Sequence, residues 1–583
     1  MISLEDPQKS IPQMGADTAP SRPFPYLWTI VALSACLRLW GLGAKSLWDD
    51  EVYTLYAASR PLGEMFRFMT ADDPHGILYV LLPKLLGITW QSSEYELRLP
   101  FAILGIVSIP LLYLCLVEFG YRSPAARLAC LLAAISPLYL QTAQEARMYP
   151  ILLVLFLLTS YLLLRWLNGR LRNSYFIPAY FLSLSLGFYT DPAPVASFAL
   201  FHLLCICLGS RRASPCLPLT LGIQAAAALS FVPYAISAAG SSHSDPFGPH
   251  WMDQFARVFN SPPSQTMMFL STVFRALQAM LFWPSDYLMS VQVSLGATRS
   301  FIPWLLVLCG TAALGLFFTN GYSAITYKGR PGGFRLVLIV AICLALGGGM
   351  LSAVPARELP AMLSLLLPLL LVFTLLCVPF WAARDNSEVT RATMAVFLAP
   401  LVLYGVLFFI PMDPRHMTVP LLFLLAHLSE SVLILCRRRS GRVLAGIFLG
   451  CIIIAGIRYY ASDTEIFHQQ DYRSAARAIS LLQEQREPLI FNCGFSGNWA
   501  FRYYLEKGGE PLAGSALGPN NCDEGDSWVL QSLDQSLRKE DHAWFMTLNR
   551  LDDSYFSMLA KLRAHQIAIQ PFGQELVLIK VTR

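Results

Sequence analysis

Carboxylate side chains cluster just after the first apolar segment of the chain, in the stretch Ser46-Leu47-Trp48-Asp49-Asp50-Glu51-Val52-Tyr53. A carboxylate can accept the proton of an attacking hydroxyl group, so Asp50 and Glu51 are candidate catalytic residues. The alternative is an ordinary helix start, because the helix dipole favours acidic side chains in the first turn. The neighbouring Trp48 and Tyr53 suit stacking on a sugar ring, although aromatic residues are also common at membrane interfaces.

Further polar side chains follow at Asp73, His75 and Tyr79, and then at Glu145 and Tyr149. We expect these five side chains to line a pocket or to contact an acceptor. The first three have an alternative without function, since Asp-Pro and His-Gly are also typical of a simple turn.

Four basic side chains stand near the ends of apolar segments: Lys84, Arg98, Arg147 and Arg415. A guanidinium group matches a phosphate bidentately, so these residues are candidates for binding a phosphate group. The alternative for the arginines is contact with lipid headgroups. A carboxylate base beside such cations would suit transfer of a group from a phosphate leaving group to a hydroxyl.

Membrane-spanning helices must position these residues. Hydrophobic residues make up 55% of the 583-residue chain, charged residues only 14%, and the mean hydropathy is +0.49. Soluble domains average about 25% charged residues, so an ordinary cytosolic enzyme is excluded. The net charge of +5 gives no sign of nucleic-acid binding. Thirteen segments have the composition of a span: 26–43, 99–119, 124–141, 148–167, 175–190, 193–209, 216–238, 300–320, 335–352, 360–382, 393–411, 417–436 and 443–460.

Two more apolar segments, 76–91 and 265–284, decide the topology. If neither crosses the membrane, all strongly basic loops fall on the cytoplasmic side, as the positive-inside rule requires. We therefore expect both to lie at the outer surface as re-entrant or interfacial helices. The N-terminus is then cytoplasmic, and the acidic loops and the C-terminal region lie outside, in the periplasm of a bacterium.

The composition divides the chain into three parts. Residues 1–25 are polar and lack a signal peptide, so we expect a disordered cytoplasmic arm. Residues 26–460 form the transmembrane catalytic domain, with an outer first loop at 44–98. Residues 461–583 hold 28 charged residues in 123, and their pattern predicts a small periplasmic α/β domain. We expect helices at 470–485, 499–507 and about 552–565, and strands at 487–491, 542–549, 567–570 and 575–581. Whether Cys493 and Cys522 pair is left open.

Six short motifs occur in one order along residues 27–510: Trp48-Asp49-Asp50-Glu51-Val52-Tyr53, Asp73-Pro74-His75-Gly76-Ile77-Leu78-Tyr79, Arg98-Leu99-Pro100, Gln144-Glu145-Ala146-Arg147-Met148-Tyr149, Pro414-Arg415-His416 and Asp471-Tyr472-Arg473-Ser474-Ala475-Ala476. Their order resembles the GT-C glycosyltransferases of family 39. That family includes protein O-mannosyltransferases, the lipid A aminoarabinose transferase and the galacturonosyl transferases of the lipopolysaccharide core.

The resemblance implies an inverting transfer from a polyprenyl-phosphate-linked sugar to a glycan, lipid or protein acceptor, on the outer face of the bacterial inner membrane. It makes Asp50 the base, followed by Glu51. Two departures from the family pattern stand at Gly76-Ile77, where the family has two prolines, and at His416, where it has tyrosine. We expect no required metal, although Asp50, Glu51, Asp73 and His75 carry donor atoms that divalent cations accept.

Other readings remain open. A transporter or lipid flippase would carry charges at span centres and internal repeats, neither of which is visible. A scaffold or sensor would not explain acids and arginines in so many outer loops. An oligosaccharyltransferase would carry a Trp-Trp-Asp type motif, which is absent. An O-antigen ligase or polymerase is a further alternative. The sequence names neither the sugar nor the acceptor.

Overall fold

The computed structural model describes residues 24–72, 75–208, 216–239 and 418–437, and parts of 442–457. It also describes 471–484, most of 489–507, 516–517, parts of 531–539, 542–548, 565–572 and 576–582. Residues 1–23 of the predicted N-terminal arm, the segment 265–284, the four predicted spans between 300 and 411, and Arg415 lie outside these residues.

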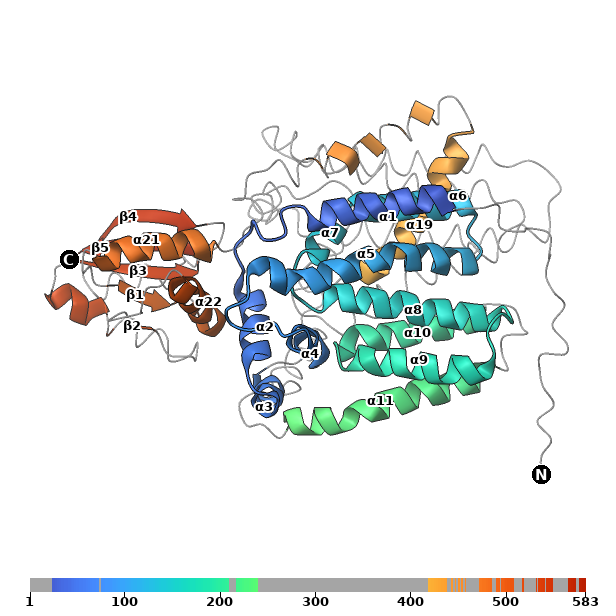
Figure 1. Ribbon diagram of the computed structural model, residues 1–583, viewed down its shortest axis with the longest axis horizontal. Helices are drawn as coiled ribbons and strands as arrows, with labels where there is room; N and C mark the ends of the chain where they lie inside the picture. The colour runs from blue at the N-terminus through green and yellow to red at the C-terminus, as the bar shows by residue number, and fades with distance from the viewer. Residues whose placement is uncertain are drawn as a thin grey trace, which may run out of the picture.

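Long apolar helices form a bundle whose members run alongside one another (Figure 1). They are α1 (Phe24–Leu39), α5 (Glu94–Glu118), α6 (Ser123–Ile135), α8 (Tyr149–Leu167), α9 (Asn173–Phe188), α10 (Pro192–Leu208), α11 (Leu217–Ala239) and α19 (Thr418–Leu435). Helix α5 packs on α1, α6 and α8, α9 lies between α8 and α11, and α19 packs on α6. Seven of the predicted spans coincide with a helix to within about five residues, because their apolar composition sets their length.

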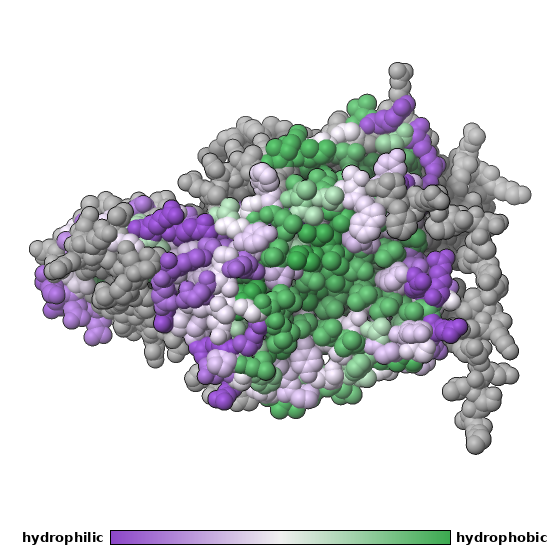
Figure 2. Space-filling view, in the orientation of Figure 1, coloured by the Kyte–Doolittle hydropathy of each residue, from purple (hydrophilic) through white to green (hydrophobic). Residues whose placement is uncertain are grey.

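Three of the described helices are long and apolar enough to cross a membrane, namely α5, α8 and α11. A fourth span arises if α6 and the short α7 (Pro137–Ala143) count as one, bent by 62°. The predicted span 124–141 is therefore broken. The break follows from Pro137, which lacks the N–H that would continue the helix. Figure 2 shows apolar residues over the bundle and hydrophilic ones toward its ends.

Three short helices lie across one end of the bundle: α2 (Asp49–Ser59), α3 (Leu62–Asp72) and α4 (Leu78–Leu85) (Figure 1). Helix α4 falls within the segment 76–91 and has only eight residues. A helix of this length rises about 12 Å, whereas the hydrocarbon core is about 30 Å thick. This agrees with the prediction that 76–91 does not cross the membrane.

The described C-terminal residues form an α/β unit, which lies beyond the end of the bundle that carries α2, α3 and α4 (Figure 1). It contains α21 (Tyr472–Glu484), β1 (Leu489–Asn492), α22 (Gly494–Lys507), β2 (Ala516–Leu517), β3 (His542–Leu548), β4 (His565–Phe572) and β5 (Leu576–Thr582). The strand order is β2-β1-β3-β5-β4.

Strand β1 runs parallel to β2 and β3, and β5 runs antiparallel to β3 and β4. Two of the three predicted helices and all four predicted strands coincide with described elements, with some parallel pairing as expected. The predicted helix at 552–565, Cys493 and Cys522 lie outside the described residues.

The two ends of the bundle differ in charge. Helix α5 begins beside α2 and ends at the far end of the bundle, away from the α/β unit (Figure 1). Connection 119–122, between α5 and α6, and connection 168–172, between α8 and α9, lie at that far end. They carry Arg122, Arg170 and Arg172. Connections 40–48, 144–148 and 189–191 lie at the other end, together with the acids of α2.

Candidate active site

Helix α2 begins at Asp49, and its first turn holds three consecutive acids, so the helix-start interpretation is correct as far as it goes. Successive residues of a helix point about 100° apart, however, and the acids therefore face different surroundings. The side chain of Asp50 is 40% exposed, whereas that of Glu51 is fully buried. The two candidate catalytic residues thus have different environments.

Glu51 is held by Arg98 in a two-point ion pair. Arg98 Nε lies 2.7 Å from Glu51 Oε1, and Nη2 lies 2.6 Å from Oε2. The backbone N–H of Ala146 also donates to Oε1 at 2.9 Å, and that of Trp48 donates to Oε2 at 3.4 Å. Because every oxygen of this buried carboxylate accepts hydrogen bonds, Glu51 is suited to hold the start of α2 rather than to take up a proton.

The other donors of Arg98 bind the backbone of the loop before α2. Nη1 donates to the carbonyl oxygens of Leu42 and Lys45 at 3.0 and 2.9 Å, and Nη2 donates to that of Ser46 at 2.8 Å. The side chain is buried, so this position leaves no donor pointing to solvent. We predicted Arg98 as a phosphate ligand, and the geometry instead makes it an anchor of Glu51 and of this loop.

Asp50 lies against a second arginine. Arg147 Nη2 is 3.4 Å from Asp50 Oδ2, and Nη1 is 3.5 Å from the Asp50 carbonyl oxygen. Nη1 also lies 3.4 Å from the hydroxyl of Tyr79, and the guanidinium stands over the Tyr79 ring at 5.0 Å. Arg147 and Tyr79 are both buried. These contacts are longer than the 2.6–2.8 Å hydrogen bonds of Arg98.

Arg147 is positioned by the connection between α7 and α8. Gln144 Nε2 donates to the carbonyl oxygens of Leu37, Arg38 and Trp40 at 3.0–3.3 Å, which satisfies the end of α1. Two residues further on, the N–H of Ala146 bonds Glu51. The connection is therefore tied both to α1 and to the start of α2, which brings Arg147 beside Asp50.

Lys84 was predicted to bind phosphate, and the structure gives it another position. Its Nζ donates to the carbonyl oxygen of Ala58 at 3.1 Å and to that of Arg60. These carbonyls end α2 and have no partner within the helix. Lys84 therefore satisfies the C-terminus of α2, about three turns from Asp50.

His75 pairs with an acid that the sequence analysis did not single out. His75 Nδ1 lies 3.3 Å from Asp191 Oδ2, and Asp191 is buried between α9 and α10. The chain next to His75 passes close to Tyr189. A Cβ on Gly76 would stand 2.0 Å from the Tyr189 carbonyl oxygen, so only glycine fits there. Tyr234 donates to the His75 carbonyl at 3.2 Å. Asp73 lies outside the described residues.

The remaining predicted residues lie around the same end of the bundle. Glu145 is half-buried and accepts a hydrogen bond from Gln141 Nε2 at 2.9 Å, and Tyr149 is buried at the start of α8. The structure adds Lys45, which the sequence analysis missed. Desolvation, and then the charge of Arg98, lower the Lys45 pKa to about 8, against the attraction of Glu145 and Glu51. Only its position before the acidic triplet could have drawn attention to it.

Among the described residues, no group of three or more His, Cys, Asp or Glu side chains has a metal-binding arrangement. The predicted independence from a metal stays a prediction. The arrangement at the end of the bundle provides one half-exposed carboxylate, Asp50, beside one buried guanidinium, Arg147. Such a pair can accept a proton and bind an anion at neighbouring points.

No protein-family model and no curated protein matches the chain. Among solved structures, AglB from Archaeoglobus fulgidus, an archaeal oligosaccharyltransferase in complex with an inhibitory peptide and a dolichol-phosphate, is 13% identical. Its TM-score is 0.44 over 93% of this chain and 71% of that one. ArnT from Cupriavidus metallidurans bound to undecaprenyl phosphate is 15% identical, with a TM-score of 0.36 over 95% of this chain and 98% of that one.

The protein O-mannosyltransferase Pmt1-Pmt2 complex of S. cerevisiae, bound to the sugar donor, is 18% identical, with a TM-score of 0.32 over 38% of this chain. The chain spans about a third of that relative's length, 34%. All three belong to the GT-C superfamily, which is also the one that the order of the motifs resembles. With TM-scores below 0.5, these similarities by themselves assign no function to the chain.

Proposed function

We propose that the chain is an inverting membrane glycosyltransferase that moves a sugar from a polyprenyl-phosphate-linked donor to an acceptor at the outer face of the bacterial cytoplasmic membrane. The observation that carries the proposal is the pair formed by Asp50 and Arg147. A half-exposed carboxylate faces a buried guanidinium, at the end of an apolar bundle. The order of the sequence motifs supports the same reaction.

In the proposed reaction, the acceptor hydroxyl attacks the anomeric carbon of the sugar while Asp50 takes the hydroxyl proton. The bond between the anomeric carbon and the phosphate oxygen breaks, and its electron pair stays on the phosphate. Arg147 stabilises the negative charge of the departing phosphate. Attack from the side opposite the leaving group inverts the anomeric configuration.

The contact between Asp50 and Arg147 suggests an order of events. At 3.4 Å from Asp50 Oδ2, the guanidinium of Arg147 already has one carboxylate partner before a donor binds. A donor phosphate carries more negative charge and binds guanidinium bidentately, so it would draw Arg147 away. Donor binding then leaves the Asp50 carboxylate available to the hydroxyl group of the acceptor.

The position of the site suits a donor whose lipid tail stays in the bilayer. The described apolar helices provide the membrane body, and the site lies where they end. Arg122, Arg170 and Arg172 lie at the opposite end of the bundle, as expected for a cytoplasmic side. We therefore place Asp50 and the α/β unit on the outer side. Glycans, lipids and proteins all present hydroxyl groups whose proton such a base can accept.

Two of the predicted residues belong to the acceptor side of this proposal. These residues are His75, which pairs with Asp191, and Glu145. Both offer hydrogen-bonding groups at the end of the bundle where Asp50 lies. We propose that the reaction requires no metal, because polyprenyl phosphate is already a fair leaving group and Arg147 supplies the positive charge. Arg415, which the resemblance also assigns to the donor phosphate, remains a proposal.

The test is mass spectrometry of envelope glycans and lipid-linked sugars in a strain that lacks the chain. We expect one polyprenyl-phosphate-linked sugar to accumulate and the same sugar to disappear from one envelope polymer, lipid or protein. Re-expression of the chain should reverse both changes. Unchanged lipid-linked sugars and unchanged envelope glycans would contradict the proposed function.

A further inference from the structure

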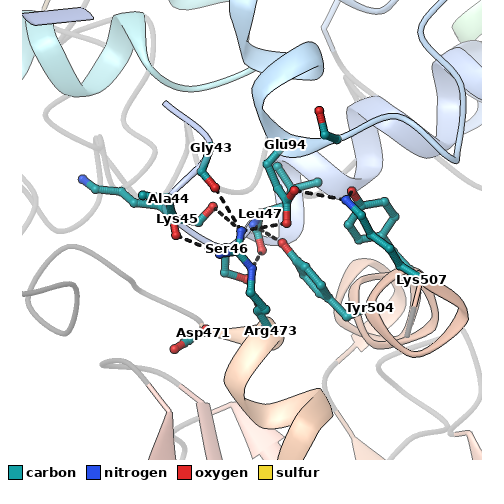
Figure 3. A network of polar contacts seen from close by, with 12 residues as sticks. Gly43, Ala44, Lys45, Ser46, Leu47, Glu94, Asp471, Arg473, Tyr504 and Lys507 are labelled. Carbon is teal, nitrogen blue, oxygen red and sulfur yellow. Dashed lines mark hydrogen bonds and ion pairs between the residues drawn. The ribbon is translucent and has the colours of Figure 1, made fainter. Parts of the chain in front are cut away.

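The loop of residues 42–46, which leads into α2, is held from two sides. Arg98 takes the carbonyls of Leu42, Lys45 and Ser46 from the membrane body. A second arginine, Arg473, approaches from the α/β unit (Figure 3). The sequence motif that contains Arg473 has no role in the proposed reaction, and the contacts of Arg473 indicate what it does instead.

Arg473 binds the two carbonyls that Arg98 leaves, those of Gly43 and Ala44, and shares the carbonyl of Lys45 with Arg98. Its Nη1 donates to the carbonyl oxygen of Ala44 at 2.9 Å, and its Nη2 donates to those of Gly43 and Lys45 at 3.2 and 3.3 Å. Between them, two guanidinium groups therefore engage every carbonyl from residue 42 to residue 46. Each arginine is paired with a glutamate, and for Arg473 this is Glu94, with Nη2 2.7 Å from Oε1.

Neighbouring groups of the α/β unit complete this contact. Lys507 Nζ lies 3.1 Å from Glu94 Oε2, and the hydroxyl of Tyr504 accepts a hydrogen bond from the Leu47 N–H at 2.6 Å. The Arg473 N–H donates to Ser46 Oγ at 3.2 Å. Glu94 is buried, so its charge is neutralised by cations that come from the α/β unit.

The motif also reaches the acidic triplet itself. The hydroxyl of Tyr472 donates to Asp49 Oδ1, one residue before Asp50. Asp471 directly precedes α21 and accepts a hydrogen bond from the Ser474 N–H at 3.1 Å, which caps the helix end that carries Tyr472 and Arg473. Three consecutive residues of the motif thus act together on the segment that positions Asp50.

We infer that Arg473 is a positioning residue for transfer: it clamps the 42–46 loop against Arg98 and so fixes the start of α2 that carries Asp50. The inference rests on the proposed function for its consequence in catalysis. It assigns the α/β unit a role in the site, since Arg473 and Tyr472 both come from that unit.

Hydrogen–deuterium exchange of the full-length protein in detergent tests the clamp without any substrate. In Arg473→Ala, peptides covering residues 42–52 should exchange about tenfold faster or more, because the local opening loses several charge-assisted hydrogen bonds. Peptides covering β3 should be unchanged. Arg502→Ala is the matched control, since it breaks an exposed pair with Glu506 on α22 and should leave residues 42–52 as in the wild type.

The conservative variant Arg473→Lys separates clamping from general stability. A lysine can still pair with Glu94, but as a point charge it cannot serve three carbonyls. We expect exchange of residues 42–52 between that of wild type and Arg473→Ala. If β3 also exchanges faster in Arg473→Ala, that variant is unfolded in part, and Arg473→Lys is used for the test instead. The inference is overturned if residues 42–52 exchange as in the wild type in a variant whose β3 stays protected.

Two further measurements connect the clamp to the reaction. Arg473→Ala should bind undecaprenyl phosphate within about twofold of wild type, because Arg147 is untouched, while a strain carrying it accumulates lipid-linked sugar. Arg473→Lys should lower that accumulation. If the strain that lacks the chain accumulates no lipid-linked sugar, the proposed function fails, and the exchange data still test the clamp. Faster exchange together with wild-type transfer would overturn the positioning role alone.

Discussion

Removing the buried Arg98 is expected to lower the unfolding free energy by a large amount. Arg98→Met keeps the apolar stem of the side chain but removes five hydrogen bonds, two to Glu51 and three to backbone carbonyls. It also leaves the Glu51 carboxylate buried without its countercharge. Breaking such a pair by removing one partner costs about 3–5 kcal/mol of unfolding free energy.

Glu51→Gln should cost a similar amount, because Arg98 is then the unpaired charge. In the double variant neither position 51 nor position 98 carries a charge. The introduced glutamine can still accept a hydrogen bond from the N–H of Ala146. We therefore expect the double variant to lose about 1–3 kcal/mol less than the sum of the two single losses.

Pulse proteolysis of the detergent-solubilised protein measures these unfolding free energies. Arg538→Met is a suitable control, because its ion pair with Asp534 is mostly exposed and should contribute less than about 1 kcal/mol. In the folded fraction, Arg98→Met should bind undecaprenyl phosphate as the wild type does. An Arg98→Met protein within about 1 kcal/mol of wild type, or single losses that simply add, would refute the structural role assigned here to the pair.

Three further outcomes are expected. Arg147→Ala should weaken undecaprenyl phosphate binding about 10–150-fold, the equivalent of about 1.5–3 kcal/mol, while the exposed control Arg67→Ala should not; equal affinities would contradict the assignment. Gly76→Ala should lower the unfolding free energy by about 1–3 kcal/mol, because its Cβ would stand 2.0 Å from the Tyr189 carbonyl, and wild-type thermal unfolding would argue against this packing. The Lys45 pKa of about 8 lies below its ordinary 10.5, so the unfolded state binds more protons between these values. Stability should therefore rise from pH 8 to pH 10.5, and Lys45→Met should reduce that rise in a pH series of unfolding measurements.

The elements of the fold could be predicted from the sequence wherever the pattern is local. The apolar segments 99–119 and 148–167 became α5 and α8, and the segment 76–91 holds only the eight-residue α4. The strand at 542–549 became β3. What the sequence did not show was the break at Pro137, because proline is tolerated inside many membrane helices and only the surrounding packing decides.

The candidate site was predictable in its location but not in its roles. Asp50 and Glu51 are adjacent and chemically similar, and they differ because α2 turns only Glu51 toward Arg98, 47 residues away. Lys84 looked like a free cation until the end of α2 was placed beside it. Arg473 and Glu94 are 379 residues apart, so their pairing depends on how the α/β unit docks. Long-range contacts of this kind leave no periodic signal in the sequence.

The most direct test of the proposed reaction is the rate of sugar transfer by Asp50→Asn, measured in membrane vesicles from a strain that lacks the chain and has accumulated the donor. Asparagine keeps the size of the side chain but cannot accept the proton, so transfer should fall about 10²–10⁴-fold. Asp49→Asn is the control, since its oxygen can still accept the Tyr472 hydroxyl. It should transfer at nearly the wild-type rate. Wild-type transfer by Asp50→Asn, or loss of transfer in Asp49→Asn alone, would contradict the assignment of Asp50 as the base.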